Sequence, residues 1–210
     1  MARLLFYILT ISVASQIAGA QTFKALFDNT LNETAGNADW IIDVQQPVPV
    51  PAQSGITPST TESYWLGAIS AWGVDLAQRG FTVHTLTSAY GITYGNPGNA
   101  YDLSNYDLFV VCEPQNPLTA AEKLAIRSFV QNGGGLMMVA DHNASDRDND
   151  GWDSPEVWND FGIDTSFGLH FQSNSETDNN FTQVATNVAT SSGDSIIHGP
   201  NGFANALEFH

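Results

Sequence analysis

The sequence predicts a doubly wound α/β fold, in which helices cover both faces of a mostly parallel sheet to give three layers. Near-continuous apolar runs, as in 106–114 and 136–141, are typical of strands buried on both faces of such a sheet. Segments with helical spacing of apolar residues alternate with these runs, which is the order expected for helix-covered parallel strands. The ~190 residues after position 20 are enough for one such domain with a full core.

The first half of the chain is expected to supply two strands and one helix. Residues 22–28 ("TFKALFD") are a short apolar run that ends in an acid and predict the first strand. Residues 61–80 show helical spacing and end in Gly80. The apolar residues that recur there at three- and four-residue steps are Trp65, Ile69, Trp72 and Leu76. Residues 81–87 ("FTVHTLT") are rich in β-branched and aromatic side chains and predict a second strand, with His84 as an ordinary edge or surface residue.

Two further strands and the helix between them come next. Residues 106–114 ("YDLFVVCEP") and 136–141 ("LMMVAD") read as buried strands. The segment between them, 118–135, opens with a capping box from Thr119 to Glu122 and ends in glycines, so it is expected to be a helix.

The last part of the chain has weaker signals. Residues 154–161 ("SPEVWNDF") predict a short helix with Ser154 as its N-cap and Pro155 at its first position. Beyond it, only 166–172 ("SFGLHFQ") and 203–209 ("FANALEF") have the composition of strands.

The N-terminus points to an exported protein. Residues 1–20 combine Arg3, an apolar run too short to span a bilayer, and the small residues "AGA", which together predict a cleaved signal peptide. Residues 21–210 then form a single domain in a secreted or periplasmic protein, and we expect this domain to continue beyond residue 210.

The formal charge of -16 repels phosphate backbones and anionic membranes. We therefore expect no bare nucleic-acid binding, and no membrane span once the signal is removed.

Acidic residues stand at the ends of three predicted strands. These are Asp28, Glu113 and Asp141, and His142 and Asn143 follow the last of them directly. With the common strand order 2-1-3-4, the three acids would meet at the carboxyl edge of the sheet, where ligands bind. Because like charges so close together require a cation or shifted pKa values, we expect a divalent site there. Magnesium, manganese or calcium fits the oxygens, and His142 also admits zinc or iron. Each acid taken singly has an alternative role in a turn or as an N-cap.

The segment 146–156 ("DRDNDGWDSPE") predicts a structural calcium loop. Three acids at alternate positions precede a glycine, as at the start of an EF-hand loop: Asp146, Asp148, Asp150 and Gly151. The carbonyl of Trp152 and the carboxylate of Glu156 would extend the ligand set. The twelfth position of the loop is Val157, so the full EF-hand pattern is not met. A solvated acidic loop is the alternative.

The loop 35–43 ("AGNADWIID") leaves the first strand beside Asp28 and carries polar groups around an apolar anchor, Trp40. Its Asn37, Asp39 and Asp43 could fold over the crevice as a lid, or support ligand-binding side chains through hydrogen bonds. A packed surface loop with its own Asx turns is an equal alternative.

Four sequence segments resemble the class I glutamine amidotransferase-like superfamily: "FD" at 27–28, "YDLFVVCEP", "LTAAEKLAIRSFVQNGGGLMMVAD" and "HGPNGF". More narrowly, "AGNADWIID" and "ADHNASDRDNDGWDSPEVWND" resemble an exported bacterial branch of it that lacks the nucleophilic cysteine. The resemblance covers most of 22–205 and implies a flavodoxin-like sheet. Family members keep a cysteine after the strand that is "LMMVA" here, whereas this chain has Asp141 there and its single Cys112 one strand earlier. Hydrolysis of glutamine by a thiolate is therefore not expected.

Several functions remain open at this point. One is a secreted metal-dependent hydrolase, in which Asp28, Glu113, Asp141 and His142 hold a metal or activate water on it. A second is a non-catalytic module of a larger exported protein, which binds calcium or a polyhydroxylated ligand such as a glycan. Its stacking surfaces would be Trp40, Trp65 and Trp152. A third is a metal-dependent nuclease, in which the cation offsets the negative surface. The partner in each case is an extracellular small molecule or polymer.

Overall fold

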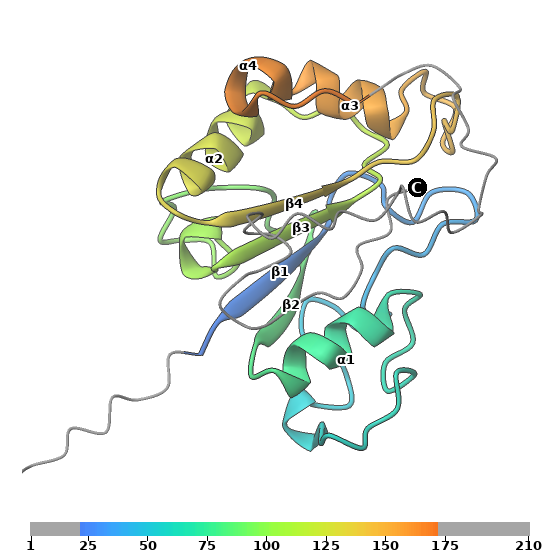
Figure 1. The fold of residues 1–210 in the computed structure, drawn as a ribbon, viewed down its shortest axis with the longest axis vertical. Helices are drawn as coiled ribbons and strands as arrows, with labels where there is room; N and C mark the ends of the chain where they lie inside the picture. Colours follow the sequence, from blue (N-terminus) through green and yellow to red (C-terminus); the bar gives the residue numbers. More distant parts are fainter. Residues whose placement is uncertain (1–21, 172–210) are drawn as a thin grey trace, which may run out of the picture.

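Four parallel strands form the sheet at the centre of the computed structural model, which describes residues 22–171 (Figure 1). Their order is β2-β1-β3-β4, so the expected parallel α/β sheet and its 2-1-3-4 order are confirmed. The strands are β1 (Lys24–Asn29), β2 (Thr82–Thr87), β3 (Leu108–Cys112) and β4 (Gly135–Val139). Phe27 of β1 lies between Thr85 of β2 and Val110 of β3, which sets the register at the centre of the sheet.

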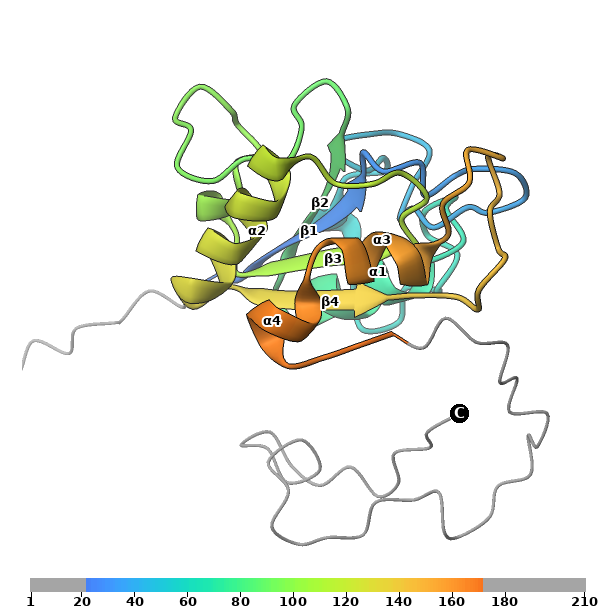
Figure 2. The same ribbon diagram turned by 90° about the horizontal axis from the view of Figure 1, so that it is seen from above.

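Alternate residues of the strands point into two separate cores. Leu26 of β1 belongs to the core under α2 (Ala120–Gln131), which also contains Ile126 and Trp158. Phe27 belongs to the other core, under α1 (Ser70–Gln78). Figures 1 and 2 show α2 on one face of the sheet, together with α3 (Ser154–Asp160) and α4 (Ile163–Phe167), and α1 on the opposite face. The strict alternation follows from the two-residue period of a strand.

Helix α1 begins much later than the spacing in 61–80 predicts. Residues 61–69 form turns instead, because their backbone bonds to the loop after β1: Gly67 N donates to the Ile42 carbonyl at 3.1 Å and Ile69 N to the Ile41 carbonyl at 3.2 Å. A Cβ on Gly67 would lie 1.9 Å from the Ile41 oxygen. The spacing of apolar residues within 61–80 does not reveal this close contact with another segment of the backbone.

Replacing Gly67 with alanine should destabilise the protein by ~2–3 kcal/mol, because the added methyl overlaps the Ile41 carbonyl and one of the two segments must move. Urea unfolding would measure the change. Gly135→Ala is a matched control, since its Cβ would meet its nearest atom at an ordinary 3.5 Å. Equal effects of the two changes would contradict the close approach.

The N-cap of α2 is the one that the sequence predicted, whereas the N-cap of α3 is a different residue. Thr119 caps α2 and completes the expected capping box with Glu122. The N-cap of α3 is Asp153, whose carboxylate accepts the Glu156 N–H at 3.0 Å, so the assignment of Ser154 is wrong. The Ser154 hydroxyl instead accepts the backbone N–H of Asp141 at 2.9 Å and joins α3 to the end of β4.

Helix α4 and strand β4 each correct a further expectation. Helix α4 covers part of 166–172, so a strand there is wrong; left-handed glycines, Gly162 and Gly168, bound this helix. Strand β4 is less buried than predicted, with Met137 45% exposed, because β3 is its one neighbour in the described sheet. The predicted segments 1–20 and 203–209 lie outside the described residues.

Two short 3-10 turns complete the described secondary structure: η1 (Gln53–Gly55) and η2 (Leu103–Asn105). No helix within 22–171 has the length and apolar character needed to cross a membrane.

Candidate functional site

The loops after β1, β3 and β4 meet at the carboxyl edge of the sheet, because these neighbouring strands all run in the same direction (Figure 1). This edge is where open parallel sheets bind ligands. It contains all the acids that the sequence singled out, but their partners differ from those expected.

Arg147 supplies the positive charge between two of the strand-end acids. One guanidinium nitrogen, Nη1, forms an ion pair with Glu113, and the other, Nη2, lies 2.9 Å from Asp141 Oδ2. The Nη1 contact lacks the alignment of a hydrogen bond, whereas the Nη2 contact has it. The side chain of Arg147 is only 16% exposed. The charge that Glu113 and Asp141 require is thus already present in the chain, one residue after Asp146.

Glu113 is held in a strained conformation at the end of β3. Its φ of 49° is in the left-handed region that residues with a Cβ rarely adopt. Trp40 Nε1 donates a hydrogen bond to Glu113 Oε2 at 2.9 Å, so the loop 35–43 reaches over this strand end. This hydrogen bond and the ion pair with Arg147 hold the Glu113 carboxylate in place, although the Glu113 backbone is strained.

The other polar residues of the loop 35–43 differ in role. Asp39 and Asp43 accept backbone N–H groups of 66–68, with Asp39 Oδ2 at 3.1 Å from Ala68 N and Asp43 Oδ1 at 3.1 Å from Leu66 N. They therefore anchor the loop to the segment before α1. Asn37 is exposed.

Asp28 forms a buried carboxyl pair with Glu33, a residue that the sequence analysis did not single out. Their exposed fractions are 1% and 0%. Burial raises the pKa of Asp28 to about 6, although Glu33 and Thr30 hydrogen bonds oppose the shift. Burial and the charge of Asp28 also raise the pKa of Glu33 well above its usual range. Glu33 Oε2 accepts the Leu31 N–H at 2.9 Å, while Oε1 has no partner among the described residues.

Cys112 lies at the end of β3 in the same acidic surroundings. Burial, followed by the charges of Glu33, Glu113 and Asp28, raises the pKa of its thiol to about 12. The thiol is 5% exposed and stays protonated at neutral pH, so its chemistry is that of a core residue.

His142 and Asn143 follow Asp141 on the surface. The His142 ring is 3.8 Å from Asp141 Oδ1 through Nε2, and its Nδ1 is 2.7 Å from the carbonyl of Asn143. The structure therefore brings Glu113 and Asp141 together on Arg147 and places His142 beside Asp141, but it directs Asp28 to Glu33. Among residues 22–171, these four do not form a group of converging metal ligands. A catalytic metal held by them remains a prediction.

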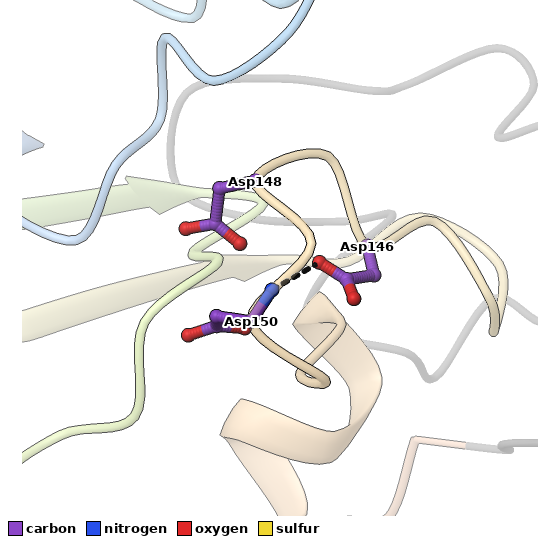
Figure 3. Close-up of side chains that lie close together, drawn as sticks. All are labelled: Asp146, Asp148 and Asp150. Carbon is purple, nitrogen blue, oxygen red and sulfur yellow. Dashed lines mark hydrogen bonds between the residues drawn. The ribbon is translucent and has the colours of Figure 1, made fainter.

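The loop after β4 brings Asp146, Asp148 and Asp150 together (Figure 3). One carboxylate oxygen from each lies within 4.8 Å of the others. Oxygens bound to one calcium ion at 2.3–2.6 Å can be at most about 5 Å apart, so this spacing is compatible with a shared ion. Asn149 and Gly151, with φ of 62° and 94°, turn the chain so that the three side chains meet.

Hydrogen bonds fix each of the three carboxylates. Asp146 accepts the N–H groups of Asp150 and Gly151 at 3.2 and 2.9 Å; burial alone would raise its pKa, but these backbone bonds outweigh that effect and lower it. Asp148 Oδ2 accepts the side chain of Asn32 at 2.6 Å. Asn116 donates to both Asp148 and Asp150 at 3.3 Å. Asp148 Oδ1 is buried and has no partner in the described part of the chain.

The two amides come from elsewhere in the sheet. Asn32 follows β1 and Asn116 follows β3, so the acidic loop after β4 is tied to the ends of these two strands. Neither residue was expected to belong to the site, since nothing in the local sequence indicates a contact across the sheet. The side chain of Glu156, an expected ligand, is not in the converging group.

A cavity of about 530 Å³ opens between the acidic loop and α3. Its lining consists of Asn143, Ala144, Asp146, Asn149, Gly151, Trp152, Asp153 and Glu156. A second cavity of about 550 Å³ shares part of that lining: Gly151, Trp152, Glu156 and Asn159. Trp152 can therefore contact a ligand, whereas Trp65 is 1% exposed and its expected role as a stacking surface is wrong.

Comparison with protein-family models, curated proteins and solved structures found no match.

Proposed function

We propose that the protein is a calcium-binding domain of an exported protein, with a three-layer, doubly wound flavodoxin-like fold. The observation that carries this proposal is the convergence of Asp146, Asp148 and Asp150, with carboxylate oxygens within 4.8 Å of one another. Asp148 Oδ1 is buried and has no partner among residues 22–171, which supports the proposal because a buried carboxylate oxygen requires a donor or a cation.

Calcium would act here as a clamp between three loops. Three carboxylates this close repel one another unless a cation offsets their charge. With the ion bound, Asn32 and Asn116 would hold the loop after β4 against the loops after β1 and β3. Calcium suits this set because it accepts six to eight oxygen ligands in flexible geometry, and carbonyls or water can complete the shell.

The geometry supports calcium binding better than hydrolysis by a metal at the strand ends. A catalytic ion held by Glu113 and Asp141 would have to displace Arg147, which is largely buried between them. A cysteine-dependent reaction is also disfavoured, because the Cys112 thiol is buried and protonated.

Calorimetric titration of the chelator-treated protein with calcium tests the proposal. We expect a Kd on the order of 10⁻⁴ to 10⁻³ M, the range of extracellular calcium modules. Calcium at 100 times its Kd should raise the free energy of unfolding by about 2.7 kcal/mol. Asp148→Asn should weaken binding by about tenfold or more, because it removes charge at the ion and a buried ligand.

Asp75→Asn is the matched control. It removes the same charge from an exposed position on α1, where Asp75 pairs with Arg79. Its calcium affinity should equal that of the wild type. If calcium binds neither protein, or binds Asp148→Asn as tightly as the wild type, the assignment of the three aspartates fails.

A further inference from the structure

The two cavities beside the acidic loop have the size and lining of a ligand site. Their volumes of about 530 and 550 Å³ fall within the roughly 300–1,000 Å³ that small-molecule sites occupy. They share Gly151, Trp152 and Glu156, so they form one continuous groove along the start of α3. We call this surface the Trp152 groove.

The polar groups of the Trp152 groove include both donors and acceptors. The side chains of Asn143, Asn149 and Glu156 make no hydrogen bond with another described residue, and these amides and this carboxylate are free to bind a ligand. Amides donate and accept, a carboxylate accepts, and the indole N–H of Trp152 donates. Hydroxyl groups both donate and accept, so they match such a mixed lining better than a purely cationic ligand does.

The aromatic surface and the negative charge of the groove narrow the chemical class of ligand further. Trp152 is partly exposed and offers an apolar ring against which the C–H face of a sugar can pack. Asp146 and Glu156 make the groove negative, which disfavours uronates, phosphates and other anionic ligands. The carboxylate of Asp153 is already used, since it accepts the N–H groups of Ala144 at 2.6 Å and Glu156 at 3.0 Å.

We propose that the Trp152 groove binds a neutral, polyhydroxylated ligand, namely a short segment of an uncharged polysaccharide. Trp152 stacks on a sugar ring, and Asn143, Asn149 and Glu156 bind its hydroxyl groups. This inference rests on the proposed function in one respect: calcium would hold Asp146, which belongs both to the ion site and to the wall of the groove.

Affinity electrophoresis in native gels tests the inference on the full chain. The gels contain one polysaccharide each from a panel of neutral polymers (β-glucan, galactomannan, xylan and arabinogalactan), with polygalacturonate as the anionic counterpart. Each is run with calcium and with chelator. We expect at least one neutral polymer to retard the wild type in calcium, and Trp152→Ala to weaken that binding by about tenfold or more.

Two more variants complete the experiment. Glu156→Ala alters an exposed residue of the same groove and should also weaken retardation, which guards against misfolding of Trp152→Ala. Tyr90→Ala removes an aromatic residue that is 41% exposed and follows β2, at the opposite edge of the sheet from β4; it should retain wild-type retardation.

The remaining outcomes separate failure of the sugar site from failure of the calcium site. Absence of retardation by every neutral polymer, in a protein that binds calcium by titration, removes the sugar site and leaves the calcium site intact. Retardation that both groove variants retain, or that polygalacturonate alone produces, also overturns the inference. Retardation that both groove variants lose, in a protein that binds no calcium, supports the groove and removes the proposed function.

Discussion

Arg147→Met should destabilise the protein by about 3–5 kcal/mol, because it leaves the carboxylates of Glu113 and Asp141 without their cation. Glu113 is 8% exposed, so water cannot replace the lost charge there. Methionine resembles the aliphatic part of the arginine side chain and preserves the packing of that part. Urea unfolding at neutral pH and a fixed calcium concentration would measure the loss.

A second substitution separates the charge effect from packing. Glu113→Gln in the Arg147→Met background should recover part of the stability, because it removes the buried carboxylate that Arg147 no longer pairs. Arg79→Met is the control for losing an arginine ion pair at the surface: Arg79 and Asp75 are 67% and 53% exposed, and solvent screens their attraction, so their pair should contribute little to stability. A loss for Arg147→Met no larger than for Arg79→Met would contradict the bridging role.

Protein stability should fall as the pH rises from about 4 to about 8, through ionisation of the buried pair of Asp28 and Glu33. The folded-state pKa of Asp28 is about 6, raised from 3.8. A group with a raised folded pKa contributes fully below its unfolded pKa, and this contribution is lost as the pH passes through the folded value. For Asp28 the shift corresponds to about 3 kcal/mol.

Asp28→Asn provides the measurement, since the amide stays neutral across this range. We expect the free energy of unfolding of the variant, relative to wild type, to rise by about 3 kcal/mol between about pH 4 and about pH 8. The comparison depends on the change with pH, so a constant packing cost of the amide does not obscure it. Parallel curves for the two proteins would exclude a buried pair that shares a proton.

Asp102 offers a control, because its pKa is lowered in the folded protein whereas that of Asp28 is raised. Burial would raise its pKa, but hydrogen bonds from Ser104, Thr93 and Asn96 lower it to about 2. Its contribution is present above the unfolded value of 3.8 and is lost only as the pH falls towards about 2. Asp102→Asn should therefore be less stable than wild type by a nearly constant amount between about pH 4 and about pH 8.

Local patterns predicted most of the secondary structure. Apolar runs and β-branched residues located the four strands described within 22–171. The Thr119 capping box located the start of α2. Each of these signals depends on residues close in sequence. The start of α1 was missed for the opposite reason. Residues 61–69 bond to the backbone of 39–42, and that contact overrides a helical pattern that the segment carries on its own.

The candidate site likewise contains some residues that local sequence predicted and others that it did not. The alternation of Asp146, Asp148 and Asp150 before Gly151 predicted which carboxylates converge, because a single tight turn brings them together. The donors that steady them, Asn32 and Asn116, were not predicted. They reach the loop only because β1, β3 and β4 are neighbours in the sheet.

Short-range patterns were enough to predict the parallel α/β class and the acidic loop, since strand period, apolar runs and turn residues act over short distances. The strand order was taken as the common 2-1-3-4 arrangement, and the structure confirms it. The pairing of the charges depends instead on the tertiary structure. Glu113 and Asp141 meet Arg147, while Asp28 meets Glu33 in the interior. A carboxylate at a strand end has the same local sequence whether its partner is a metal, an arginine or another acid. The choice depends on which side chains the packed sheet places within a few ångströms, and that is a property of the whole fold.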